Sequence, residues 1–193
     1  MATHASAESD ALMHYMKATA HTRRLLEVVT LDQWEASTPC TDWNVKKLVK
    51  HMISGAKNAE SVMRGYGPQN CSEIFSEGLV VAFDAACKAA IAAFSVPGVM
   101  GTMVQTRRGE QLAGNYALGQ VQEMLVHGWD LATAIGADTS MDLELLGVSY
   151  DRAVRSRGHL RNGGATVWGE SEATVTENAD IQTQYLAILG RPS

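Results

Sequence analysis

The sequence lacks the features of a membrane protein, a secreted protein or a disulfide-rich protein. No apolar run approaches the ~20 residues that a helix needs to span a bilayer. The opening MATHASAESD lacks the charged and then apolar order of a secretory signal, so we expect a cytoplasmic protein. The three cysteines, Cys40, Cys71 and Cys87, are odd in number and widely spaced, and they form neither a disulfide framework nor a CxxC metal motif. We expect Cys87, which lies among alanines, to be a small core residue.

Positive charge is sparse as well. The 16 Lys and Arg against 21 Asp and Glu give a formal net charge of −5, and the basic residues form only short clusters. Nucleic acid is therefore not expected as a partner, because binding to its backbone needs a concentrated basic face. With 46% hydrophobic and 19% charged residues, the composition is that of an ordinary globular protein. A chain of 193 residues fits a single domain, which we expect to extend over residues 1–193.

The most informative absence is that of lysine and arginine from residues 109–151. Within this stretch, YALGQVQEMLVHGWDLATAI at 116–135 predicts a helix that is apolar on most faces and therefore buried on most sides. Its polar residues recur every three or four positions, which places them on one face. A solvated face usually carries some long basic side chains, so we interpret this polar stripe as the lining of a site. The stripe consists of Tyr116, Gln120, Glu123, His127 and Asp130.

Two residues of the stripe predict a metal site. Glu123 and His127 lie one turn apart, so both can reach one metal ion whose other ligands come from other helices. Among the six histidines, His51 is the strongest candidate for the third ligand, because it lies on the flank of the apolar stripe of the helix predicted at 45–64. The alternative for His51 is a surface histidine beside lysines. His14 and His21 are expected to face solvent.

The rest of the stripe supplies candidate pocket residues. Tyr116 and Gln120 offer a hydroxyl and an amide for contact with a cofactor or substrate. Asp130 is a candidate catalytic residue, which would accept a hydrogen bond from a ligand imidazole or serve as a general base. A buried structural hydrogen bond is the alternative for Asp130. Trp129 faces away from the stripe and is expected in the core.

Helical periodicity over most of the chain predicts an all-α fold, namely a four-helix bundle with short additional helices. The weak alternation at 99–113 predicts a small extended excursion with a turn at Arg108-Gly109. Ser9, Asn44 and Ser72 are the expected helix caps. Residues 158–169 are expected to be irregular. The predicted helices are 10–29, 45–64, 73–94, 116–135, 143–155 and 179–189.

Several motifs together resemble a known family. TPCTDW at 38–43, LVKH ending at His51, VHGWDLA at 126–132 and LAILGR near the C-terminus are similar to the metal-binding domain of mycothiol-dependent maleylpyruvate isomerases, within the DinB/YfiT-like group of four-helix-bundle metalloenzymes. They occur in the expected order over nearly the whole chain. The resemblance implies a divalent metal, usually zinc, held by His51, Glu123 and His127, a ligand set that also suits nickel or iron.

The resemblance also implies a chemistry. Three protein ligands leave a position open, which in the family receives a low-molecular-weight thiol such as mycothiol, whose pKa the metal lowers. The expected function is a thiol-dependent transferase or isomerase, whose partners are a small-molecule thiol and an electrophile. The alternatives are a metal-binding bundle without catalysis and a metal-dependent hydrolase with Asp130 as base.

This chain departs from the family pattern at its C-terminus, and the sequence leaves its oligomeric state open. Family members typically continue into an additional C-terminal domain, whereas this chain ends at Ser193 soon after LAILGR, so the expectation does not extend to maleylpyruvate itself. Bundles of this group are often homodimers, and the alanine-rich helix predicted at 73–94 suits either a dimer interface or internal packing.

Overall fold

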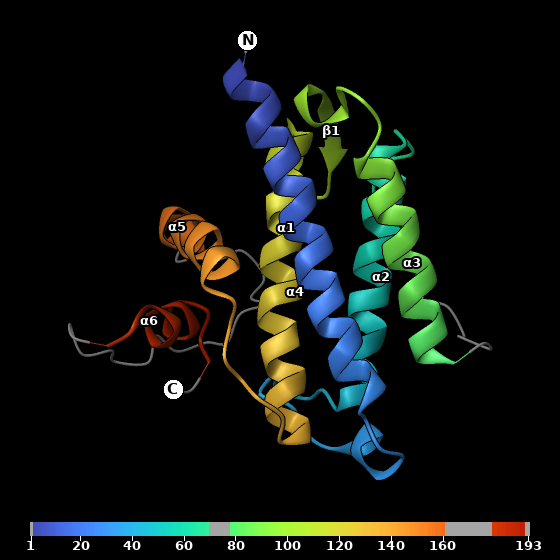
Figure 1. Cartoon of the computed structure of the whole chain (residues 1–193), viewed down its shortest axis with the longest axis vertical. Coiled ribbons are helices and arrows are strands. Elements are labelled where there is room, and N and C mark those ends of the chain that lie inside the picture. The colour runs from blue at the N-terminus through green and yellow to red at the C-terminus, as the bar shows by residue number, and fades with distance from the viewer. Residues whose placement is uncertain (1, 70–77, 161–178, 192–193) are drawn as a thin grey trace.

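The computed structural model describes residues 2–69, 78–160 and 179–191, which form an all-α fold with one small hairpin. Four long helices lie side by side, a two-stranded sheet covers one end of them, and two further helices lie to one side (Figure 1). Among the helices of these residues, none combines the length and the apolar character that crossing a bilayer requires.

The four bundle helices surround one hydrophobic core. Helix α1 packs against α3 and α4, and α2 packs against the same two helices, so that α4 has neighbours on two sides of the bundle. Core side chains come from all four helices, and include Tyr15, Leu48, Phe83 and Leu131. The bundle helices are α1 (Ala2–Glu27), α2 (Val45–Met63), α3 (Leu79–Phe94) and α4 (Ala113–Ile135).

The remaining elements connect or flank the bundle. Strands β1 and β2 pair antiparallel in the order expected for a hairpin, with Met103 opposite Leu112. Helix α5 packs against α4 on a further side, and α6 packs against α5. These elements are the 3-10 helices η1 (Asp32–Glu35) and η2 (Val99–Gly101), the strands β1 (Met103–Thr106) and β2 (Gly109–Leu112), and the helices α5 (Leu143–Leu160) and α6 (Ile181–Ile188).

Most predicted helices are confirmed, with shifted ends. Helix α1 begins well before residue 10, because the alanine-rich start favours helix, so Ser9 lies inside α1 and does not cap it. Helix α3 begins at Leu79 after Gly78, and the predicted cap, Ser72, lies outside the described residues. Helix α5 continues past residue 155, which contradicts the irregular chain predicted at 158–160, while 161–169 lie outside the described residues. The predicted excursion is the hairpin β1–β2, with its turn at 107–108.

The sequence also misplaced histidines of α1. His14 was expected to face solvent but is 8% exposed, and its Nε2 lies 3.2 Å from Oε1 of Glu144 at the start of α5. His21 is half-buried rather than solvent-facing. Trp129 is half-buried and packs against the core. Both histidines are covered because α5 and its preceding connection lie across α1, a long-range contact that helix periodicity does not reveal.

Local sequence fixes the register of α2. Asn44 has extended backbone and its side chain accepts a hydrogen bond from Lys47 N at 2.9 Å, which starts the helix at Val45. Val45, Leu48 and Val49 are fully buried against the bundle core. With this face turned inward, His51 lies on its flank, where it is half-buried.

Helix α4 ends at a glycine for a stereochemical reason. Gly136 has φ 69°, in the left-handed region that glycine adopts without a Cβ clash, and its backbone N–H donates to carbonyls of the last turn. The helix preceding it is buried on most sides by α1, α2 and α5. This packing explains why the helix is apolar on most faces.

We expect Asn44→Ala to lower the free energy of unfolding by about 1 kcal/mol, because the N-cap acceptor of α2 is lost. Urea denaturation measures the change. Asn44→Ser keeps a capping oxygen and is the control, for which we expect a smaller loss. Equal losses in both variants would show that capping is not what Asn44 contributes.

Candidate metal centre

Three predicted ligands from two helices converge in the structure. His51 Nε2 on α2 lies 3.7 Å from Oε2 of Glu123 on α4, and Nε2 of His127 lies 3.4 Å from the same oxygen. The two imidazole rings meet edge to face, with centroids 4.9 Å apart. One ligand atom from each residue lies within 4.8 Å of the others. A site lined by two imidazoles and one carboxylate fits a divalent metal such as zinc, and these donors also suit nickel and iron.

The charges of the site suit a cation. Burial alone would raise the pKa of Glu123, but the neighbouring imidazoles of His127 and His51 outweigh it and lower that pKa, so the carboxylate is ionised at neutral pH. For His127, burial lowers the pKa, and the hydrogen bonds to Asp130 and Cys40 together with the nearby carboxylate of Glu123 raise it well above its ordinary value. The negative charge around His127 thus outweighs the desolvation of its imidazolium. The same negative charge attracts a metal cation.

Trp43 holds the two histidine rings in place. Its ring centroid lies 4.7 Å from that of His51 and 6.0 Å from that of His127. The turn before it is closed by Thr38, whose Oγ1 donates to the carbonyl of Trp43 at 3.0 Å and accepts from Cys40 N at 3.2 Å. The TPCTDW motif therefore folds into a turn that packs an indole beside the candidate ligands.

Behind His127 lies a buried polar cluster. Nδ1 of His127 is 2.9 Å from Oδ2 of Asp130, and both side chains are fully buried. Arg191, which follows α6, donates from Nε to Oδ1 at 2.9 Å and from Nη2 to Oδ2 at 2.8 Å of the same carboxylate. With Asp130 accepting from Nδ1–H, the imidazole presents Nε2 toward Glu123 and His51, which is the nitrogen a metal there requires.

This geometry bears on the role predicted for Asp130. Burial would raise its pKa, but the hydrogen bonds to His127 and Arg191 outweigh it and lower that pKa. A carboxylate that is closed off from solvent and shared between two cationic partners is a poor general base for a substrate. The hydrogen bond to a ligand imidazole therefore describes its position better than direct catalysis does.

The other residues of the stripe lie on the same side of α4 as Glu123. Tyr116 is 7% exposed, and its hydroxyl accepts a hydrogen bond from Nδ2 of Asn58 at 3.1 Å. Burial raises the pKa of Tyr116 to about 12, so it stays a neutral phenol. Gln120 is half-buried, between Tyr116 and Glu123 along the helix. Contact of Tyr116 or Gln120 with a cofactor remains a prediction.

Arg152 on α5 lies beside the candidate site, a position that the sequence did not reveal. A Cβ added at Gly119 would lie 3.1 Å from its Nη2, so the guanidinium rests on α4 one turn before Glu123. Within the described part of the chain this guanidinium forms no hydrogen bond and no ion pair. Burial lowers the pKa of Arg152, as do the charges of Arg108 and Arg155. In the sequence Arg152 belongs only to the short basic cluster at 152–161, and this cluster does not indicate that Arg152 packs against α4.

Cys40 and Arg191 were also missed as site residues, although both belong to motifs that carry the family resemblance. Cys40 is 9% exposed, and its Sγ lies 3.8 Å from Nδ1 of His127 and 3.1 Å from Oδ2 of Asp130. Cys40 is far from Glu123 and His127 in the sequence, but the fold brings it beside His127. Cys87 is buried in α3, as predicted.

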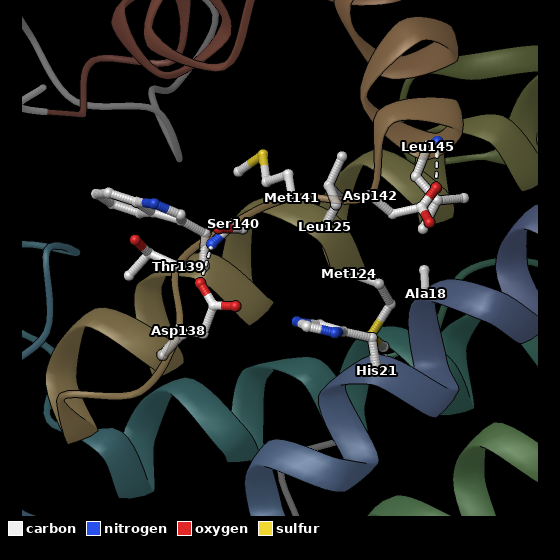
Figure 2. A pocket seen from close by; sticks show the side chains of 12 residues that line it. Ala18, His21, Met124, Leu125, Asp138, Thr139, Ser140, Met141, Asp142 and Leu145 are labelled. Atoms are coloured by element: carbon white, nitrogen blue, oxygen red, sulfur yellow. Dashed lines mark hydrogen bonds between the residues drawn. The ribbon is translucent and has the colours of Figure 1, made fainter.

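A separate hollow lies away from this centre. It opens between α1, α4 and the connection from α4 to α5, and Figure 2 shows His21, Met124, Asp138 and Met141 among its walls. Its cavity volume is about 20 Å³, which is enough for a water molecule but not for a small-molecule substrate. Burial lowers the pKa of His21, with Arg24 acting in the same direction. This hollow is not the candidate active site.

The fold and the arrangement of the polar stripe define the class of protein as a DinB-like all-α bundle. Two crystal structures of the mycothiol-dependent maleylpyruvate isomerase are similar in fold: the enzyme itself, with TM-score 0.64 and 15% identity, and a histidine-to-alanine mutant, with TM-score 0.61 and 14% identity. Each match covers 76% of this chain and 69% of the other.

Sequence comparison gives the family. The profile of the mycothiol maleylpyruvate isomerase N-terminal domain matches residues 15–70. An uncharacterized protein of Mycobacterium tuberculosis, found in two strains, is 34% identical over 137 residues, which cover 70% of this chain and 73% of the relative. The chain belongs to the mycothiol maleylpyruvate isomerase N-terminal domain family.

We expect Asp130→Asn to lower the free energy of unfolding at pH 7 by about 3–5 kcal/mol, because Arg191 is left as an uncompensated buried charge. Since the folded pKa of Asp130 lies below the unfolded value, its stabilisation is present above the unfolded pKa and is lost as pH falls through the folded one. The difference in the free energy of unfolding between wild type and Asp130→Asn should therefore become smaller below about pH 4. Urea denaturation in the presence of a chelator at several pH values measures it.

The control for this variant is Asp84→Asn. It breaks another arginine–aspartate pair, in which Arg23 Nε lies 2.6 Å from Asp84 Oδ1 and the carboxylate is 34% exposed. A half-exposed pair is worth at most about 1 kcal/mol. A similar loss in the free energy of unfolding for Asp84→Asn and Asp130→Asn would contradict the larger stabilisation that we expect from the buried Asp130–Arg191 pair.

Proposed function

We propose that this protein is a metal-dependent enzyme that uses a small-molecule thiol of the mycothiol type, as an isomerase or a transferase. The observation that carries the proposal is the convergence of His51, Glu123 and His127 on one another at the flank of the bundle. Membership of the family supports the thiol, since the two similar structures are described as mycothiol-dependent.

Each ligand residue has a defined role in this proposal. His51 and His127 supply imidazole nitrogens and Glu123 an ionised carboxylate, and three protein ligands leave a position for an exogenous molecule. A divalent metal held by them would lower the pKa of a thiol bound there. The side chains of His51 and Glu123 are 34% and 29% exposed, so a molecule from solvent can reach this side of the site. Trp43 and Asp130 keep the imidazoles oriented.

The surroundings favour an electrophile that carries negative charge. Arg152 lies along α4 one turn from Glu123, and the structure assigns its guanidinium no hydrogen bond or ion pair with a described residue. Arginine binds carboxylates through paired donors, and maleylpyruvate, the substrate that the similar enzyme's name gives, is a carboxylate. Gln120 and Tyr116 lie on the same side of α4 and are the polar residues we assign to substrate contact.

The hydrolase alternative is less well supported. It needs a general base beside a water molecule in the open part of the site, and Asp130 was the candidate. That carboxylate is fully buried and already accepts hydrogen bonds from His127 and Arg191. A metal-binding bundle without catalysis is the alternative that the experiments below separate from an enzyme.

Three further properties remain proposals. We propose one domain across residues 1–193 and a cytoplasmic location, where small-molecule thiols are kept reduced. A homodimer also stays a proposal, and helix α3 gives it little support. Its alanines at 82, 86, 90 and 93 are buried within this chain, so they serve internal packing.

The test of the metal site compares wild type with His51→Ala, Glu123→Ala and His127→Ala by elemental analysis of untagged protein. We expect near-stoichiometric metal in the wild type, and affinity more than about 100-fold weaker in each variant, beyond the loss typical of outer-sphere partners. His14→Ala is the matched control, since this buried histidine pairs with Glu144 away from the site and should leave metal content unchanged.

The thiol is tested on the same proteins. Addition of mycothiol to the cobalt-substituted wild type should change its visible absorption, because sulfur enters the coordination sphere, and should support turnover of an electrophile. A bound metal whose spectrum ignores thiols, in a protein that turns over no electrophile, would leave the non-catalytic bundle as the better description.

We expect Arg152→Gln to raise KM for an anionic electrophile by about 10–100-fold, the range of one charge-assisted hydrogen bond, with little change for an uncharged analogue. Steady-state kinetics with both substrates measure it. Arg155→Gln, an exposed arginine on the same helix, is the control and should have a much smaller effect. Equal losses for the charged and the uncharged substrate would contradict the role given to Arg152.

A further inference from the structure

The two ring nitrogens of His127 face two different sets of metal-ligand atoms. Nε2 faces Glu123 and His51, the outer set. Nδ1 faces Asp130 Oδ2 at 2.9 Å and Cys40 Sγ at 3.8 Å, the inner set. In both sets the ligand atoms lie within 4.8 Å of one another. A neutral imidazole has one nitrogen free of hydrogen, so a metal on Nδ1 would remove the tautomer that the outer set needs.

The inner set is a strong competitor by its chemistry. A cysteine, a histidine and an aspartate are all common zinc ligands, and a thiolate favours zinc over harder ions. A metal there would also be out of reach of a co-substrate, because Asp130 and His127 are fully buried and Cys40 is 9% exposed. Function at the outer set therefore requires that the inner set stay free of metal.

The guanidinium of Arg191 occupies two of the three residues of the inner set, Cys40 and Asp130. Its Nη2 donates to Cys40 Sγ at 3.0 Å and to Asp130 Oδ2 at 2.8 Å, and its Nε donates to Asp130 Oδ1 at 2.9 Å. The guanidinium is 2% exposed and is further fixed by Nη1, which donates to the carbonyl of Leu189 at 3.1 Å. Guanidinium has no lone pair to offer a metal, and its permanent charge repels a divalent cation at this distance.

We infer that Arg191 is a resident cation that excludes metal from the Cys40–His127–Asp130 set and thereby directs it to His51, Glu123 and His127. Arg191 has a second effect, because its hydrogen bonds to Asp130 also hold that carboxylate against Nδ1 of His127. The inference rests on the proposed function only in taking the outer set as the working metal site.

The experiment is a cobalt titration of full-length wild type and Arg191→Met. Cobalt bound to cysteine sulfur gives a strong near-ultraviolet charge-transfer band, whereas cobalt on imidazole and carboxylate does not. We expect no such band in the wild type. In Arg191→Met we expect the band and additional or relocated cobalt, and we expect Cys40→Ser in the same background to abolish the band.

Two further variants separate the loss of the Arg191 charge from a loss of folded structure. Arg191→Gln keeps an amide donor for Asp130 but has no charge, and it should show the band even where the methionine variant does not fold. Arg191→Lys keeps the charge and should not show it. Circular dichroism in the presence of a chelator establishes that each protein is folded before cobalt is added.

The inference is overturned by a thiolate band in the wild type, by its absence from both uncharged variants, or by an equal band in Arg191→Lys. These outcomes are separable from failure of the proposed function. Wild type that binds no cobalt refutes the outer metal site, while a cysteine-dependent band in the Arg191 variants still establishes what Arg191 excludes.

Discussion

The structure of the site depends on one buried imidazole. His127 is fully buried, and each of its ring nitrogens faces a carboxylate, Glu123 on the outer side and Asp130 on the inner side. An imidazole in that position must have its tautomer fixed, because the two nitrogens cannot exchange roles without losing a buried hydrogen bond. The surrounding elements supply this fixation: Trp43 packs on the ring, and Arg191 fixes the inner carboxylate.

The bundle provides the rigid support that such a site needs. Helix α4 is enclosed by α1, α2 and α5, so its polar residues lie on the one side that the apolar packing leaves to them. Helix α2 is anchored by its Asn44 cap and its buried face, which sets His51 opposite Glu123. Ligands on packed helices hold their geometry better than ligands on loops, since their rotamers are limited by neighbours.

Charge is distributed unequally around the centre. The inner side is a closed network in which Arg191 compensates Asp130, while the outer side keeps Glu123 and His51 partly exposed. Arg152 adds positive charge along α4, where it rests on Gly119. A buried ion pair is weak evidence for stability by itself, and its value here is orientation. The inner side of His127 is thus closed and charge-compensated, whereas Glu123 and His51 on its outer side are open to solvent.

The sequence by itself determined the approximate positions of the helices, the all-α class and the members of the polar stripe, because helical periodicity is a local property of the chain. It named His51, Glu123 and His127 together, since two of them share a helix face and the third lies on the flank of another. Only the tertiary structure decided that Cys40 and Arg191 meet Asp130, and that Arg152 rests on α4. Those contacts join residues as much as 151 positions apart. They depend on how the helices pack and how far the side chains extend, and neither produces a periodic pattern in the sequence.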